Sequence, residues 1–112
     1  MPRYLISFEH GAMDHIPAEE GPAVGEAAHA AVQEAMDAGV FVFAGGCSEE
    51  VSVVDGGGTV SDAAENKGYL GGVTIIDVPS REDALEWAAK IAAACRCPQE
   101  LREIMPDPAV GN

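Results

Sequence analysis

The residue in this sequence best suited to acid–base chemistry is His29, because an imidazole titrates near neutral pH and can accept and return a proton. It lies in an alanine-rich stretch, and on a helical wheel it falls at the border of the apolar stripe, near Gly25 and Met36. A side chain at that border could reach a cleft between a helix and a sheet without being fully buried. The alternative is a half-exposed surface histidine with no chemical role.

Asp62 is the second candidate for a catalytic role. It follows a predicted strand and opens a polar stretch, and catalytic side chains are often displayed on such loops. A carboxylate beside His29 would fix the tautomer of the ring and favour its charged form. The alternative is an aspartate that forms a turn by bonding its own backbone.

Three other side chains are predicted to contact a ligand: His10, Lys67 and Tyr69. The alternative for Lys67 is a local surface ion pair, because it lies beside Asp62 and Glu65 in the sequence. His10 belongs to a loop, residues 9–15, that holds two histidines and two carboxylates. Such groups can bind zinc, manganese or iron, but no known metal-ligand spacing is met, so we predict a solvated acidic loop and no metal.

The glycine runs at residues 56–58 and 71–72 do not predict a cofactor. Neither is followed by the Lys-Ser/Thr pair of a phosphate-binding loop. The first run is typical of a hairpin turn. We therefore expect a cofactor-free protein.

The three cysteines predict a reducing environment. An odd count, Cys47, Cys95 and Cys97, without a visible signal peptide favours free thiols and a cytoplasmic location. Cys95 continues an apolar helix stripe and is predicted to lie in the core. Cys47 and Cys97 are expected to be dispensable for stability.

The composition limits the classes of partner. The 112 residues predict one domain, 1–112, with its core at about 3–104 and a tail at 105–112. Nineteen acidic residues against six basic ones give a net charge of −13. Such a surface repels phosphate backbones and anionic lipid headgroups, so neither nucleic acid nor a membrane is an expected partner.

Hydrophobic periodicity predicts the elements that position these residues. In the first half, strands are expected at 4–9 and 40–44, with a helix at 22–38 between them and a hairpin at 51–61. In the second half, a strand at 72–78 is the strongest in the chain. A helix capped by Ser80 runs to about residue 94, with an apolar stripe that includes Leu85. A strand at 100–104 follows.

The order β-α-β-hairpin-β-α-β predicts an α+β fold of the ferredoxin-like kind. Two helices can cover only one face of such a sheet. The other face needs a cover, and the same face of a second copy is the usual one because a two-fold contact is self-complementary. We therefore expect a homodimer.

Several stretches of the second half carry a family resemblance. They are Val60-Ser61-Asp62, Lys67, Leu70-Gly71-Gly72, Ile76-Asp77-Val78 and Ala84-Leu85-Glu86-Trp87-Ala88. In this pattern the chain resembles the YCII-related (DGPF-motif) family. The resemblance implies a dimeric α+β barrel and a His–Asp pair in a cleft as the acid–base apparatus. The chain departs from the Asp-Gly-Pro-Phe signature, because Ala63-Ala64-Glu65 follows Asp62.

Three hypotheses for function follow. The first is a cofactor-free lyase, isomerase or hydrolase of a small molecule, with His29 as general acid or base and Asp62 as its partner. The second is a non-catalytic small-molecule binding or regulatory module that uses the same cleft. The third is a structural partner of another protein, which would need an exposed apolar patch outside the dimer contact.

Overall fold

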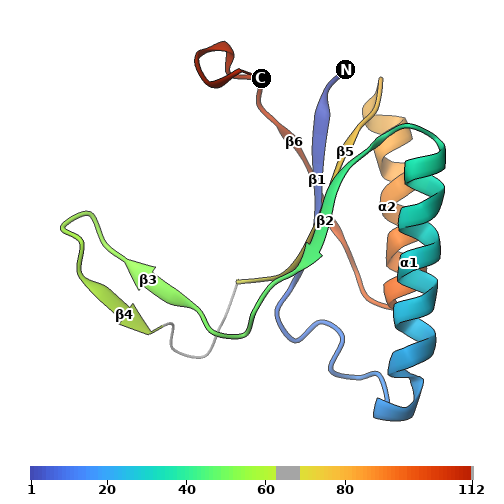
Figure 1. The fold of residues 1–112 in the computed structure, drawn as a ribbon, viewed down its shortest axis with the longest axis horizontal. Coiled ribbons are helices and arrows are strands. Elements are labelled where there is room, and N and C mark those ends of the chain that lie inside the picture. Colours follow the sequence, from blue (N-terminus) through green and yellow to red (C-terminus); the bar gives the residue numbers. More distant parts are fainter. Residues whose placement is uncertain (63–68, 112) are drawn as a thin grey trace.

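The computed structural model describes residues 1–62 and 69–111 of the chain (Figure 1). Its elements follow the predicted order, with a short 3-10 helix, η1, before the first long helix and another, η2, near the end. They are β1 (Arg3–Glu9), η1 (Ala18–Glu20), α1 (Gly21–Asp37), β2 (Phe41–Gly46), β3 (Ser52–Val54), β4 (Val60–Asp62), β5 (Leu70–Asp77), α2 (Arg81–Cys95), β6 (Glu100–Ile104) and η2 (Pro108–Val110).

The main sheet has four strands in the order β2-β5-β1-β6, and every neighbouring pair is antiparallel. Each helix connects two strands that are not hydrogen-bonded neighbours, as in the predicted ferredoxin-like α+β fold. Figure 1 shows both helices on one face of this sheet. That fold is therefore confirmed, and no helix of residues 1–62 and 69–111 lies on the opposite face of the sheet.

Strand β5 supplies the centre of the core because it pairs on both sides, with β1 and with β2. Its side chains alternate between the faces, as a strand requires. Thr74 and Ile76 are buried on the helix side, whereas Val73 and Ile75 are half-buried on the open side. The register pairs Tyr4 of β1 with Ile76, and both side chains are buried against the helices.

The alanine stripe of α1 allows this helix to approach the sheet closely. Ala31 and Ala35 are buried, and Val24 is buried at the start of the same stripe. The matching stripe of α2 is Ala84, Ala88, Ile91 and Cys95. The prediction that Leu85 belongs to this stripe was wrong. It is 49% exposed, because successive helix residues are rotated by about 100° and Ala84 already occupies the position facing the sheet.

The ends of both helices follow from local chemistry. The Ser80 side chain accepts a hydrogen bond from the backbone N–H of Asp83 at 3.2 Å, so the predicted N-cap of α2 is confirmed. Gly39 has a φ of 75° just beyond α1, which is the left-handed conformation that glycine adopts without strain. Arg96 takes the same conformation after α2, with a φ of 57°.

The predicted hairpin is present, and β3 and β4 form a two-stranded sheet separate from the main one. Its turn is fixed by Asp55, whose carboxylate accepts hydrogen bonds from the N–H groups of Gly57 and Thr59, each at 2.9 Å. All six strand residues are exposed, and Val54 and Val60 are each 62% exposed. Figure 1 shows the hairpin projecting from the body of the molecule.

All three cysteines are free. Cys47 is exposed and Cys95 is buried, as expected. Cys97 is buried as well, which the sequence did not indicate, and its dispensability for stability stays a prediction. The chain turns sharply at Arg96 and directs Cys97 back into the core cluster beside Cys95.

None of the helices in the described part of the chain combines the length and the apolar character needed to cross a membrane.

Candidate functional site

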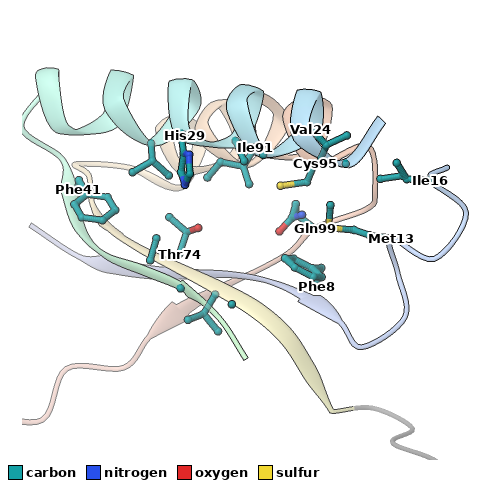
Figure 2. Close-up of a pocket in the computed structure, with 18 of the residues that line it drawn as sticks. Phe8, Met13, Ile16, Val24, His29, Phe41, Thr74, Ile91, Cys95 and Gln99 are labelled. Atoms are coloured by element: carbon teal, nitrogen blue, oxygen red, sulfur yellow. The ribbon is translucent and has the colours of Figure 1, made fainter. Parts of the chain in front are cut away.

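A pocket of about 620 Å³ lies between α1 and the main sheet (Figure 2). Helix α1 forms one wall, and β5, β2 and Phe8 of β1 form the opposite one. The end of α2 and the loop that carries Met13 and Ile16 close one end. Among the described residues that line the pocket, none is Asp, Glu, Lys or Arg. The pocket is therefore an apolar site with a few polar groups in its walls.

His29 is the polar group that α1 contributes to this pocket. Figure 2 shows its ring pointing from the helix toward the sheet. The residue is exposed as a whole, so it stands at the border of the buried stripe, where the helical wheel puts it. The imidazole can therefore meet a bound molecule and solvent at once.

Thr74 faces His29 from the other side of the pocket. It belongs to β5, it is only 7% exposed, and Figure 2 shows its side chain pointing from the sheet toward α1. The sequence analysis missed this residue because a threonine in a β-branched strand looks like packing. Its position in the strand could have indicated a role in the site. Thr74 is the polar member of a row, with Ile76 and Val78, that alternation directs at the helices.

Gln99 and Cys95 lie at the other end of the pocket. The Gln99 amide donates a hydrogen bond to Sγ of Cys97 at 3.4 Å. Burial raises the pKa of the Cys95 thiol, and the neighbouring Cys97 raises it further. Cys95 is therefore protonated at neutral pH, a poor nucleophile and part of an uncharged wall. Sequence reasoning also missed Gln99.

Phe8 holds its place in the pocket wall because two glycines make room for its ring. A Cβ at Gly72 would lie 2.6 Å from Cε1 of Phe8, and a Cβ at Gly71 would lie 2.8 Å from Cε2. Both distances are far below van der Waals contact. The two glycines at the start of β5 are therefore needed here because any side chain at either position would collide with the Phe8 ring.

Two glycines, Gly21 and Gly25, leave part of the α1 wall of the pocket without side chains. Both line the pocket, and a Cβ built on either would meet no atom within 4 Å. Neither has a positive φ, so the backbone conformation does not require glycine at these positions. The pocket is wider along this part of the helix than an alanine stripe would make it.

The structure does not bring Asp62 to His29 within one chain. Asp62 ends β4, is exposed, and does not line the pocket. Figure 1 shows β4 and α1 on opposite sides of the main sheet. The predicted His–Asp pair is therefore not assembled by a single copy.

The other predicted ligand contacts also lie away from the pocket. His10 donates its backbone N–H to the carbonyl of Tyr69 at 2.8 Å, and its Nε2 lies 3.6 Å from a carboxylate oxygen of Glu49. Neither His10 nor Tyr69 lines the pocket, and Lys67 lies outside the described residues. Over residues 1–62 and 69–111, no three His, Cys, Asp or Glu side chains gather as metal ligands.

The comparison with known families gives one match. The model of the YCII-related domain matches residues 9–106. Of β1 that range contains only Glu9, but it contains both helices and the other three strands of the main sheet, and with them the whole lining of the pocket except Phe8. No curated protein matches the chain.

Proposed function

Since this chain belongs to the YCII-related family, we propose that it binds a small, mainly apolar molecule in the pocket between α1 and the sheet. The observation that carries this proposal is the character of the walls: apolar, uncharged, and interrupted by His29 and Thr74, which face each other. A volume of about 620 Å³ falls within the range of small-molecule sites. Binding requires only these features.

An acid–base enzyme is the second candidate, and the direction of the His29 ring into the pocket favours it. In the mechanism predicted from sequence, His29 moves the proton and Asp62 orients the ring. Because Asp62 lies on the hairpin of the same chain, away from the pocket, its carboxylate would have to come from a second copy. The binding function does not require Asp62 from a second copy, so we prefer it to the enzyme.

A homodimer is part of this proposal. The face of the sheet opposite the helices carries Leu5, Phe43 and Ile75 side by side in register, and Phe43 is 55% exposed. The face of a second copy would cover these side chains through a self-complementary contact.

Two neighbouring alanines of α1 test the binding function. Ala28 lines the pocket and Ala27 is exposed on the same helix and does not. Ala28→Phe should fill the pocket, whereas Ala27→Phe should leave it open. The measurement is the set of ligand-induced NMR shifts from a library of neutral aromatic fragments.

We expect fragments to shift the amides of Gly25, His29 and Thr74 in the wild type and in Ala27→Phe. In Ala28→Phe the same fragments should shift none of these amides. Equal shifts in both variants would mean that the fragments bind elsewhere and that the pocket is not the site. Thermal melts of the two variants check that each is folded.

A further inference from the structure

We propose that the pocket selects an uncharged molecule with a hydroxyl or carbonyl at one end. That polar end lies between His29 and Thr74, and the apolar body lies against the bare stretch of α1 at Gly21 and Gly25. This inference rests on the proposed binding function. It adds the ligand class and two determinants, Thr74 and Gly25, that the sequence did not indicate.

The hydroxyl of Thr74 is the first argument. The residue is 7% exposed and points into the pocket, yet none of the side-chain hydrogen bonds among the described residues involves it. Its oxygen is not among the fully enclosed polar atoms that lack a partner, so it is accessible from the pocket and can still form a hydrogen bond. A ligand hydroxyl or carbonyl placed in the pocket would supply that partner.

His29 lies opposite and can complete the contact. Its imidazole points at the same space from α1 (Figure 2), and none of the side-chain hydrogen bonds among the described residues involves it either. A neutral imidazole offers one donor and one acceptor nitrogen, and the threonine hydroxyl offers both roles. One ligand oxygen between them can therefore accept from one wall and, as a hydroxyl, donate to the other.

Gly25 is the second argument, because nothing in the free protein explains it. It lies in the second turn of the alanine-rich helix α1, where glycine is less favourable than alanine. A Cβ there would meet no atom within 4 Å, so packing does not require its absence. Gly25 also precedes His29 by four residues, which places both on one face of the helix in adjacent turns. The room left at Gly25 is suited to the body of a ligand held by His29.

The charge of the walls gives the third argument. No described lining residue is a carboxylate, lysine or arginine. The nearest arginine along the chain, Arg96, is already paired with Glu20. A charged ligand would lose its hydration without gaining a counter-ion, and an anion would also be repelled by the net charge of −13. The ligand class is therefore neutral.

Three matched probes test the inference: naphthalene, 2-naphthol and 2-naphthoate, titrated at pH 7 into the wild type, Thr74→Val and Thr74→Ser. In the wild type, 2-naphthol should bind about tenfold more tightly than naphthalene, which corresponds to one hydrogen bond. Thr74→Val should reduce this advantage to about twofold or less and leave naphthalene unchanged, since it removes only the hydroxyl contact. Thr74→Ser should retain the advantage, and 2-naphthoate should bind most weakly.

Gly25→Ala tests the position of the body. It should weaken naphthalene and 2-naphthol by the same factor and raise the melting temperature, because alanine is the better helix residue. The exposed Ala27→Gly is the control: it should lower the melting temperature and leave both affinities unchanged.

The outcomes separate the two proposals. Binding that Ala28→Phe abolishes, but that shows the same 2-naphthol advantage in Thr74→Val as in the wild type, would overturn the polar contact and leave the binding function standing. The tightest binding by 2-naphthoate would overturn the neutral ligand class. Failure of all three probes to shift any pocket amide in the wild type would overturn both proposals.

Discussion

A single methyl group added at Gly72 tests how the wall of the pocket is built. The Cβ of an alanine there would lie 2.6 Å from Cε1 and 2.7 Å from Cζ of Phe8. The backbone of Gly72 has no positive φ, so alanine fits the strand itself. The Cβ would also lie 3.4 Å from the Gly45 carbonyl oxygen, which is close to ordinary contact, so most of the effect of Gly72→Ala should come from the collision with the aromatic ring.

The magnitude follows from the two ways in which the ring can respond. If Phe8 stays, the crowding costs about 1–3 kcal/mol, as for other overpacked positions. If it rotates out, the protein loses the burial of a large apolar side chain, about 1.5–3 kcal/mol for full burial. We expect a loss of about 2 kcal/mol, which for a domain of about this length is a fall in melting temperature of roughly 10 °C.

The assay is urea denaturation of Gly72→Ala, Phe8→Ala and the double variant. Because Phe8→Ala removes the ring, adding Gly72→Ala to it should cost less than about 0.5 kcal/mol, which gives a large coupling between the two positions. Gly45→Ala on the neighbouring strand is the control, since its Cβ would lie 3.7 Å from the Phe43 ring, an ordinary contact. If the double variant loses as much free energy of unfolding as the two single variants together, the glycines are not there to make room for the Phe8 ring.

Three further outcomes are expected. Light scattering at micromolar concentration should give about twice the chain mass of 11.6 kDa, and a folded monomer would remove the dimer from the proposal. A thiol reagent at neutral pH should modify Cys47 quickly and Cys95 and Cys97 only after unfolding. Their pKa values are raised above 9.0, mainly by burial, so the stability they contribute is complete below pH 9 and is lost as pH rises through the folded-state values. The fall should be shallower in Cys95→Ala. Asp62→Asn should leave 2-naphthol binding unchanged, and a loss would place Asp62 in the pocket of a partner copy.

Most of the fold could be predicted because its signals are local. The alternation in β1, the alanine stripe of α1, the Asp55 turn and the Ser80 cap each depend on residues a few positions apart. Local patterns of this kind set the type and order of the elements. The open face of the sheet then followed from the rules of layer packing.

The site was harder to predict because its parts meet only in three dimensions. His29 could be chosen from its own helix, but the group opposite it depends on the register of β5 against β1 and β2, which periodicity does not give. Thr74 and Gln99 were missed for this reason. The burial of Cys97 was not predicted because it depends on the left-handed turn at Arg96.

The separateness of the β3–β4 hairpin has a consequence for how the molecule opens. An isolated pair of three-residue strands with exposed side chains has little tertiary burial to protect its amide hydrogens. The amides of residues 52–62 should therefore exchange with solvent through local openings, while those of β1 and β5 exchange only when the whole fold opens. Exposed segments of this kind are also where proteases cut first. We therefore expect the β3–β4 hairpin and the main sheet with its helices to open as two separate units. A substitution that destabilises one unit should then leave the stability of the other unchanged.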